Sequence, residues 1–114
     1  MTHAFDSVAV LAVLVVYALA TARHLGLSTT VLLLAGDKDD WTPADRCRTL
    51  VSSLSRTGIV DAVYYPNAYH SFDSKVADRT VPGAAGKQHH LAYDTAAAPD
   101  AEARTKAFFA KHLR

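Results

Sequence analysis

The sequence predicts an α/β domain in which helices cover the faces of a parallel sheet. Residues 29–65 run in the order strand, helix, strand, which is the pattern of a βαβ unit. The first of these strands, 29–35, is apolar at nearly every position, as strands buried on both faces of a parallel sheet usually are. The chain has 114 residues, 50% of them hydrophobic and 20% charged, which suits one small globular domain.

Residues 27–114 carry the elements of this domain in a regular order. The first strand ends at Gly36, and Pro43 is a favoured first-turn residue for the helix after it. That helix ends near Gly58, a residue type that commonly terminates helices, and a second strand follows over 59–65. These elements predict the C-terminal half of a parallel sheet with flanking helices.

The last third of the chain is predicted to be irregular and then helical. Residues 66–97 have the character of loops because they contain Pro82, Gly83 and Gly86. A helix over 99–112 has acidic residues near its start and basic residues near its end, which complements the helix dipole. The residues of this helix expected to pack on the sheet are Ala103, Ala107, Phe108 and Leu113.

Residues 1–26 form a separate apolar segment whose structure the pattern leaves open. Residues 7–22 carry no charge and are apolar on all sides, so that periodicity does not separate a buried helix from a strand. The segment is short for a membrane-spanning helix, and its start, MTHAFD, lacks the basic residues of a signal peptide. We therefore expect a cytoplasmic protein. Ala18-Leu19-Ala20 resembles a cleavage site, so a secreted or membrane-anchored protein stays as the alternative.

Charge and cysteine content exclude several classes of function. The net charge is +1 with no basic face or tail, so we expect no nucleic-acid partner. Cys47 is the single cysteine, which rules out an internal disulfide and a cysteine-rich zinc site. A cation site made of Asp37, Asp39 and Asp40 is not expected, because their loop lacks the glycine and closing glutamate of a calcium loop.

Acidic residues and a histidine follow the two predicted strands. The loop GDKDDWTP comes after the first strand, and His70 lies in the loop after the second. Functional groups collect beyond the carboxyl ends of parallel strands, and neighbouring strands lie about 5 Å apart. We therefore expect a carboxylate to reach His70. Such a pair fixes the tautomer of the imidazole and stabilises its protonated form, as a general base requires.

The two loops together resemble a known family. GDKDDWTP, with the spacing G-x-x-D-x-x-x-P, followed by YPNAYHSFD, is similar to the C-terminal part of dienelactone hydrolase family proteins, which are α/β-hydrolases. The resemblance covers residues 25–114 and implies a partial α/β-hydrolase fold. It implies that Asp39 is the acid and His70 the base of a nucleophile-His-Asp triad. It implies no cofactor, and a small ester or lactone as the substrate of the parent family.

The resemblance also suggests where a substrate is held. Three aromatic residues of the two motifs, Trp41, Tyr69 and Phe72, are the candidate substrate-binding residues. Trp41 either lines a pocket or packs over its own loop. Family members that cleave dienelactone carry an arginine shortly after the histidine, whereas this chain has Lys75 there. A lysine does not reproduce the two-pronged contact of arginine with a carboxylate, which argues against dienelactone itself.

The nucleophile of the family has no counterpart in the sequence. It is a cysteine or serine on a G-x-[CS]-x-G elbow upstream of the acid, but Ser7 and Ser28 lack the flanking glycines and Cys47 lies in the helix after the acid. We therefore expect acid and base without a nucleophile, in a chain that is inactive alone. The alternative is a non-catalytic piece that assembles with a separate N-terminal half. An exposed sheet edge makes self-association a further expectation.

Each candidate residue also has a purely structural interpretation. Asp39 would then organise a turn or cap the helix after Pro43, and His70 would be a loop histidine bonded to a carbonyl group. Asp37 and Asp40 are expected to be solvated or capping. His89 and His90 are expected in a solvated loop, because adjacent side chains point in different directions and suit a metal poorly.

Overall fold

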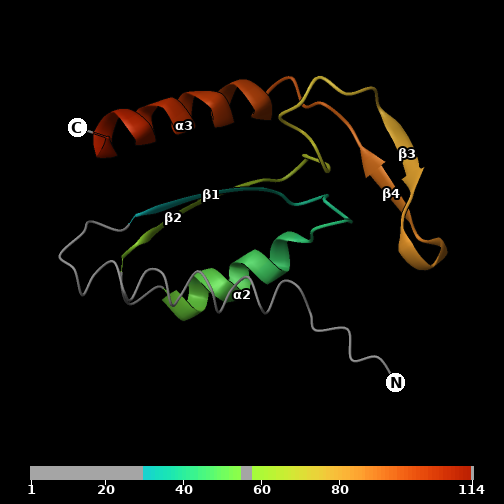
Figure 1. Cartoon of the computed structure of the whole chain (residues 1–114), viewed down its shortest axis with the longest axis horizontal. Coiled ribbons are helices and arrows are strands. Elements are labelled where there is room, and N and C mark those ends of the chain that lie inside the picture. Colours follow the sequence, from blue (N-terminus) through green and yellow to red (C-terminus); the bar gives the residue numbers. More distant parts are fainter. Residues whose placement is uncertain (1–29, 55–57, 114) are drawn as a thin grey trace. The chain divides into compact units, whose positions relative to one another are not determined.

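The computed structural model describes residues 30–54 and 58–113 (Figure 1). The chain divides into two compact units, Met1–Val31 and Leu32–Arg114, and nearly all of the described residues belong to the second unit. The predicted apolar segment 7–22 and the expected domain boundary at residue 26 lie outside the described residues.

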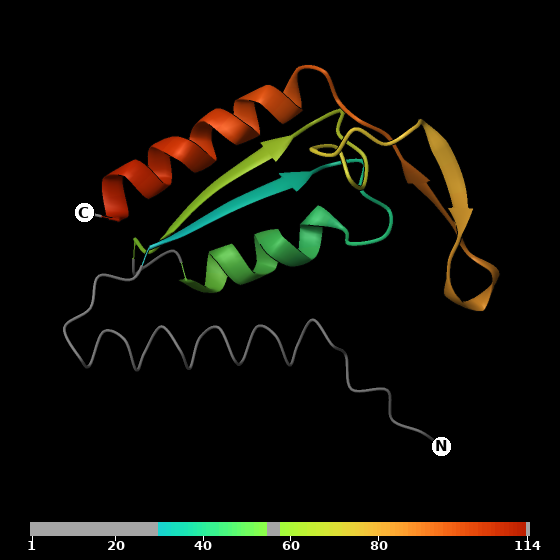
Figure 2. The same cartoon turned by 45° about the horizontal axis from the view of Figure 1, so that its top comes forward.

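A two-stranded sheet lies between two helices. Strands β1 (Val31–Gly36) and β2 (Val60–Tyr65) pair with each other and run in the same direction in Figure 2. Both views place helix α2 (Ala44–Leu54) on one face of this sheet and helix α3 (Ala97–His112) on the other. The predicted α/β class with a small parallel sheet is therefore confirmed.

Burial of β1 differs from the expectation. Val31–Ala35 were expected to be buried on both faces, but all five side chains are half-buried and only Gly36 is buried. Within the described residues β1 has one strand neighbour, β2, so it is an edge strand there. Most of the buried apolar residues in the described part of the chain are alanines. The full set is Ala44, Ile59, Ala68, Leu91, Ala92, Ala97, Ala98 and Ala101.

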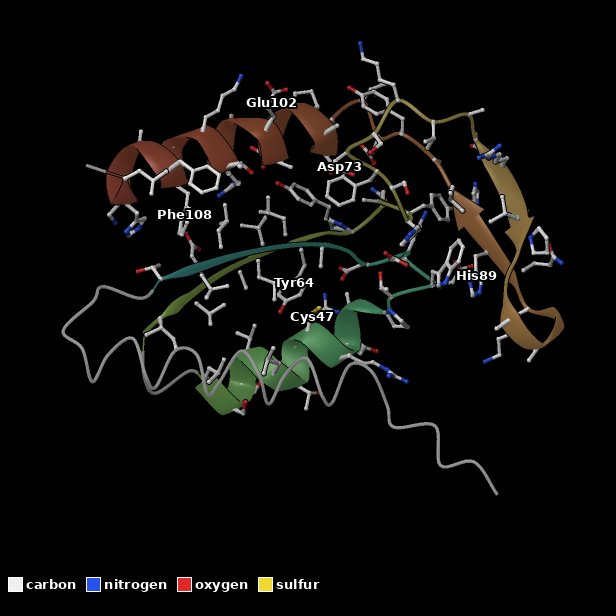
Figure 3. The ribbon with its side chains drawn as sticks, in the orientation of Figure 1. Cys47, Tyr64, Asp73, His89, Glu102 and Phe108 are labelled. Atoms are coloured by element: carbon white, nitrogen blue, oxygen red, sulfur yellow. The ribbon has the colours of Figure 1, made fainter. Side chains whose placement is uncertain are left out.

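Of the four residues in and directly after α3 that were expected to pack on the sheet, Phe108 is half-buried and the other three are exposed. Ala103 and Ala107 are exposed and Leu113 is 75% exposed, whereas the buried side chains lie in the first turns. Phe108 points toward the sheet, and Glu102 lies on the opposite side of the helix (Figure 3). Because alanines occur on every side of this helix, their spacing alone does not identify the packed face.

Asp94 determines where α3 begins. Its Oδ1 accepts hydrogen bonds from the backbone N–H groups of Ala96 (2.9 Å) and Ala97 (2.8 Å). A side chain that accepts such bonds satisfies donors that lack a partner at a helix N-terminus. The helix therefore starts at Ala97, two residues before the predicted start.

A β-hairpin occupies a region that was expected to be loop. Strands β3 (Arg79–Pro82) and β4 (Gln88–Leu91) are antiparallel, with Arg79 opposite Leu91 and Pro82 opposite Gln88. A 3-10 turn, η2 (Ala84–Gly86), connects them. Strands of four residues give too short a pattern for periodicity to detect, although the Pro-Gly pair and the second glycine were usable turn signals. The expectation of a solvated loop at His89 and His90 was therefore wrong.

Candidate active site

Two backbone hydrogen bonds join the loop after β1 to the loop after β2. The N–H of Asp37 donates to the carbonyl of Tyr65 at 2.9 Å, and the N–H of Lys38 donates to the carbonyl of Ala68 at 3.0 Å. A Cβ atom on Gly36 would lie only 2.4 Å from the oxygen of Ala68, which is completely buried. The glycine of G-x-x-D and the alanine of Y-P-x-A-x-H are thus the residues at which the loops touch.

This contact brings Asp39 and His70 together. His70 Nδ1 lies 3.0 Å from Asp39 Oδ2, and the two side chains are 28% and 12% exposed. The predicted meeting of these two loops at one edge of the sheet is what the structure shows. Ser71 follows directly with φ of 61°, a left-handed conformation that is uncommon for a residue other than glycine.

Asp39 also organises its own loop. Its Oδ1 accepts the backbone N–H groups of Trp41 at 2.9 Å and Thr42 at 2.8 Å, and its Oδ2 accepts the Thr42 hydroxyl at 2.8 Å. The turn-forming interpretation and the histidine-binding interpretation are therefore both satisfied by one carboxylate. Four donors hold its two oxygens in place.

The electrostatics keep Asp39 ionised. Burial acts to raise the pKa of Asp39, but the hydrogen bonds from Thr42, His70 and Trp41 together outweigh it and lower the pKa below the ordinary value. An ionised carboxylate only accepts hydrogen bonds, so His70 donates through Nδ1–H. When the ring is neutral and its proton is on Nδ1, Nε2 carries the free lone pair. Within residues 30–54 and 58–113, Nε2 makes no hydrogen bond.

A pocket of about 360 Å³ lies next to this pair. Asp39 and His70 line it, together with Leu34 of β1, Cys47 of α2 and Ala101 of α3. The sheet and the two helices that cover its opposite faces therefore all contribute to the lining of the pocket. A concave space with apolar walls and a few convergent polar groups is the usual form of a small-molecule site.

The three predicted substrate-binding residues occupy different surroundings. Phe72 lines the pocket and also contacts the Tyr65 ring, with centroids 5.2 Å apart. Trp41 lies over the His70 ring, with centroids 5.1 Å apart and an interplanar angle of 36°. The Tyr69 ring stacks on the His90 ring, with centroids 3.9 Å apart, and the Lys38 ammonium lies over the Tyr69 ring at 5.4 Å from its centroid.

The other two acids of the loop hold neighbouring elements. Asp37 forms an ion pair with Arg48 of α2, whose guanidinium lies 4.2 Å above the Tyr64 ring. Asp40 accepts the backbone N–H of His90 at 3.2 Å, which ties the acid loop to β4. Sequence reasoning missed both roles. Arg48 is 11 residues beyond Asp37 on the next helix, and His90 lies on strand β4, which was not predicted.

Cys47 and Tyr64 face each other on the α2 side of the sheet (Figure 3). Cys47 is half-buried and lines the pocket, but it makes no hydrogen bond to His70 in the described part of the chain. The hydroxyl of Tyr64 is buried there without a hydrogen-bond partner, and burial is the main reason why the pKa of Tyr64 is raised.

Two further features of the described residues bear on function. No group of three or more metal-ligating side chains comes together in residues 30–54 and 58–113. In the same part of the chain, no helix combines the length and the apolar character that crossing a bilayer requires.

A carboxylate–histidine pair thus lies beyond two adjacent strand ends of a parallel α/β sheet. The sequence profile of the Dienelactone hydrolase family matches residues 4–113, nearly the whole chain. The chain belongs to this family, and the match includes the N-terminal segment as well as the two motifs. Searches of the curated proteins and of the solved structures return no significant match.

Proposed function

We propose that Asp39 and His70 are the acid and base of an ester or lactone hydrolase of the nucleophile-His-Asp type. The observation that carries the proposal is the hydrogen bond between His70 Nδ1 and Asp39 Oδ2, 3.0 Å long, beside a pocket of about 360 Å³. The family to which the chain belongs is a family of hydrolases, and the pair occupies the two motifs that the family shares.

The geometry suits a histidine that takes up and returns a proton in each half of the reaction. Nε2 of His70 takes the proton of a hydroxyl or thiol nucleophile, which attacks the carbonyl carbon of the ester. The imidazolium that results is stabilised by Asp39, whose lowered pKa keeps it ionised. His70 then gives the proton to the departing alkoxide, and the acyl group stays on the nucleophile. In the second half of the reaction, His70 takes a proton from water as the water oxygen attacks the acyl carbon, and it returns that proton to the nucleophile as the bond to the acyl group breaks and the acid leaves.

We place the nucleophile outside these 114 residues. No serine or cysteine upstream of Asp39 stands between the glycines of an elbow, and no described hydroxyl or thiol is hydrogen-bonded to Nε2 of His70. On this proposal the chain has the partial α/β-hydrolase fold that supplies acid and base. It acts when it assembles with a half that carries the elbow.

Hydrolysis of p-nitrophenyl acetate tests this proposal in two arms. The chain alone should hydrolyse the ester no faster than the His70→Ala variant. A mixture with an N-terminal half of a family member that carries its G-x-C-x-G elbow should turn the ester over. His70→Ala should then reduce the rate by roughly 10²–10⁴-fold, the usual contribution of general base catalysis.

His112→Ala is the matched control, because His112 is exposed on α3 and belongs to neither loop. It should leave the rate of the mixture unchanged. A His70-dependent burst of product from the chain alone would show that a nucleophile is present after all. Association of the two halves without any His70-dependent turnover would contradict the acid–base role.

A further inference from the structure

Trp41 lies between two histidines from different parts of the chain. On one side its indole contacts the His70 ring at 5.1 Å, and on the other it stacks on the His89 ring at 4.6 Å with an interplanar angle of only 12°. Both distances fall within the range in which aromatic pairs attract each other. The base, the tryptophan and His89 therefore form one continuous row of rings.

His89 is held firmly at the far end of this row. It is 7% exposed, and a Cβ atom on Gly83 would lie 2.3 Å from its Cδ2 and Nε2 atoms. Its ring thus rests directly on the Gly83 backbone, where strand β3 passes into the turn of the hairpin; Figure 3 shows His89 beside this hairpin. Its Nδ1 lies 3.6 Å from Asp40 Oδ1, beyond hydrogen-bond range, and has no partner. Ring contact, rather than a hydrogen bond, joins His89 to the acid loop.

Strand β4 is also attached to the backbone of the base itself. His70 and Leu91 form a parallel bridge, and the N–H of Ala92 donates to the His70 carbonyl at 3.3 Å. Side chains alternate along a strand, so His89 and the buried Leu91 share one face while His90 lies on the other. His89 is therefore the residue of β4 that faces the acid loop and the base.

We propose that His89 is a positioning residue for His70 and acts through Trp41. The proposal rests on the role of His70 as base. Asp39 Oδ2 at 3.0 Å and the Thr42 hydroxyl at 3.4 Å both contact the ring at the single atom Nδ1, which leaves the imidazole free to tilt about that atom. Trp41 restricts the tilt on one face of the ring, but its side chain is 44% exposed and would be free to move without a second support. The stack on His89 provides that support.

The proton on Nδ1 of His70 provides a readout that does not need turnover. A proton shared between an imidazole and a carboxylate gives a far-downfield ¹H NMR signal, which His70→Ala identifies by its loss. Its rate of exchange with solvent measures how well the ring is held. His89→Leu and Trp41→Leu should each speed that exchange by roughly twofold to tenfold, the factor that an aromatic pair contributes.

His90→Leu is the matched control. His90 is adjacent in sequence, but its side chain contacts Tyr69 and Asp78 on the opposite face of β4. This variant should leave the exchange rate unchanged. His89→Phe keeps a ring on Trp41 and should restore slow exchange. Gly83→Ala forces the His89 ring to move without removing it, and should speed exchange as His89→Leu does.

Unchanged exchange in both Trp41→Leu and His89→Leu would overturn the proposal. So would an equal acceleration in His90→Leu, which would indicate general loosening of the hairpin, or a His89→Phe variant no better than His89→Leu. If His89→Leu does not fold, Trp41→Leu decides, because its site is partly exposed. The signal reports the Asp39–His70 contact itself. A mixture of halves without turnover but with normal exchange would therefore count against the proposed function and not against the positioning role.

Discussion

Replacing Gly36 with alanine tests the close approach that brings the acid and the base together. The added Cβ atom would lie 2.4 Å from the carbonyl oxygen and 2.9 Å from the carbonyl carbon of Ala68. Ordinary van der Waals contact begins at 3.4 Å, so the two segments have to separate by about 1 Å. The obstructing atoms are backbone atoms of a completely buried residue, which cannot rotate away.

The expected cost follows from two contributions. Overpacking a well-packed site costs about 1–3 kcal/mol, and separation of the segments weakens the hydrogen bond from Lys38 N–H to the Ala68 carbonyl, about 0.5–1.5 kcal/mol. Together they predict that Gly36→Ala lowers the free energy of unfolding by about 1.5–4.5 kcal/mol. That is a large part of the roughly 5–15 kcal/mol typical of a whole domain.

Urea denaturation measures this change, and Gly86→Ala is the control. Gly86 has φ of 71° and nothing within 4 Å of the added Cβ atom, so alanine there costs only the left-handed conformation, about 1 kcal/mol. Gly36 is not among the residues of positive φ, so alanine at that position adds no strain from a left-handed backbone. Amide hydrogen exchange adds a local readout, since the Lys38 amide should lose protection more than amides of α3.

A Gly36→Ala variant no less stable than Gly86→Ala, with the Lys38 amide still protected, would refute this reasoning. It would mean that the loops do not meet at Gly36 and Ala68. The 3.0 Å contact between Asp39 and His70 would then need another explanation.

Three further predictions concern pH and association. The folded-state pKa of Asp39 is lowered from 3.8, so ionised Asp39 stabilises the fold above pH 3.8 and this stabilisation is lost as the pH falls through the lowered pKa. Urea titrations at several pH values should show that Asp39→Asn removes part of the acid dependence of stability. An unchanged pH profile of stability would contradict this prediction. Burial, together with the hydrogen bond to Asp100, raises the pKa of Tyr65 to about 12. Ultraviolet titration should therefore show a tyrosine that ionises near pH 12, and this step should be absent in Tyr65→Phe and should occur at lower pH in Asp100→Asn. Strand β1 is half-buried and is an edge strand within the described residues, so we expect the chain to self-associate. Leu33→Lys should then reduce the molar mass measured by light scattering at high concentration. A constant monomer mass for the unaltered chain would exclude self-association.

The sequence alone determined the order of the main elements and the pair at the site. The apolar runs after Thr29 and Ile59 are local patterns, and both strands lie within two residues of their predicted bounds. Neighbouring parallel strands lie about 5 Å apart and end at the same edge of a sheet, so the residues that follow β1 and β2 come close together. That is why a contact between one acid of this loop and His70 could be predicted without coordinates, whereas the choice of Asp39 among the three acids came from the resemblance to the family.

Only the tertiary structure decided what surrounds the pair. The hairpin that carries His89 has strands of four residues, and its position is determined by contacts with loops far away in the sequence. Alanines on all sides of α3 concealed which face would be buried, and β1 is half-buried because it is an edge strand within the described residues. Burial and ring stacking depend on neighbours that are distant along the chain, whereas strand ends and turns depend on neighbours that are close. The pair could therefore be predicted from the sequence, but the support of Trp41 by His89 could not.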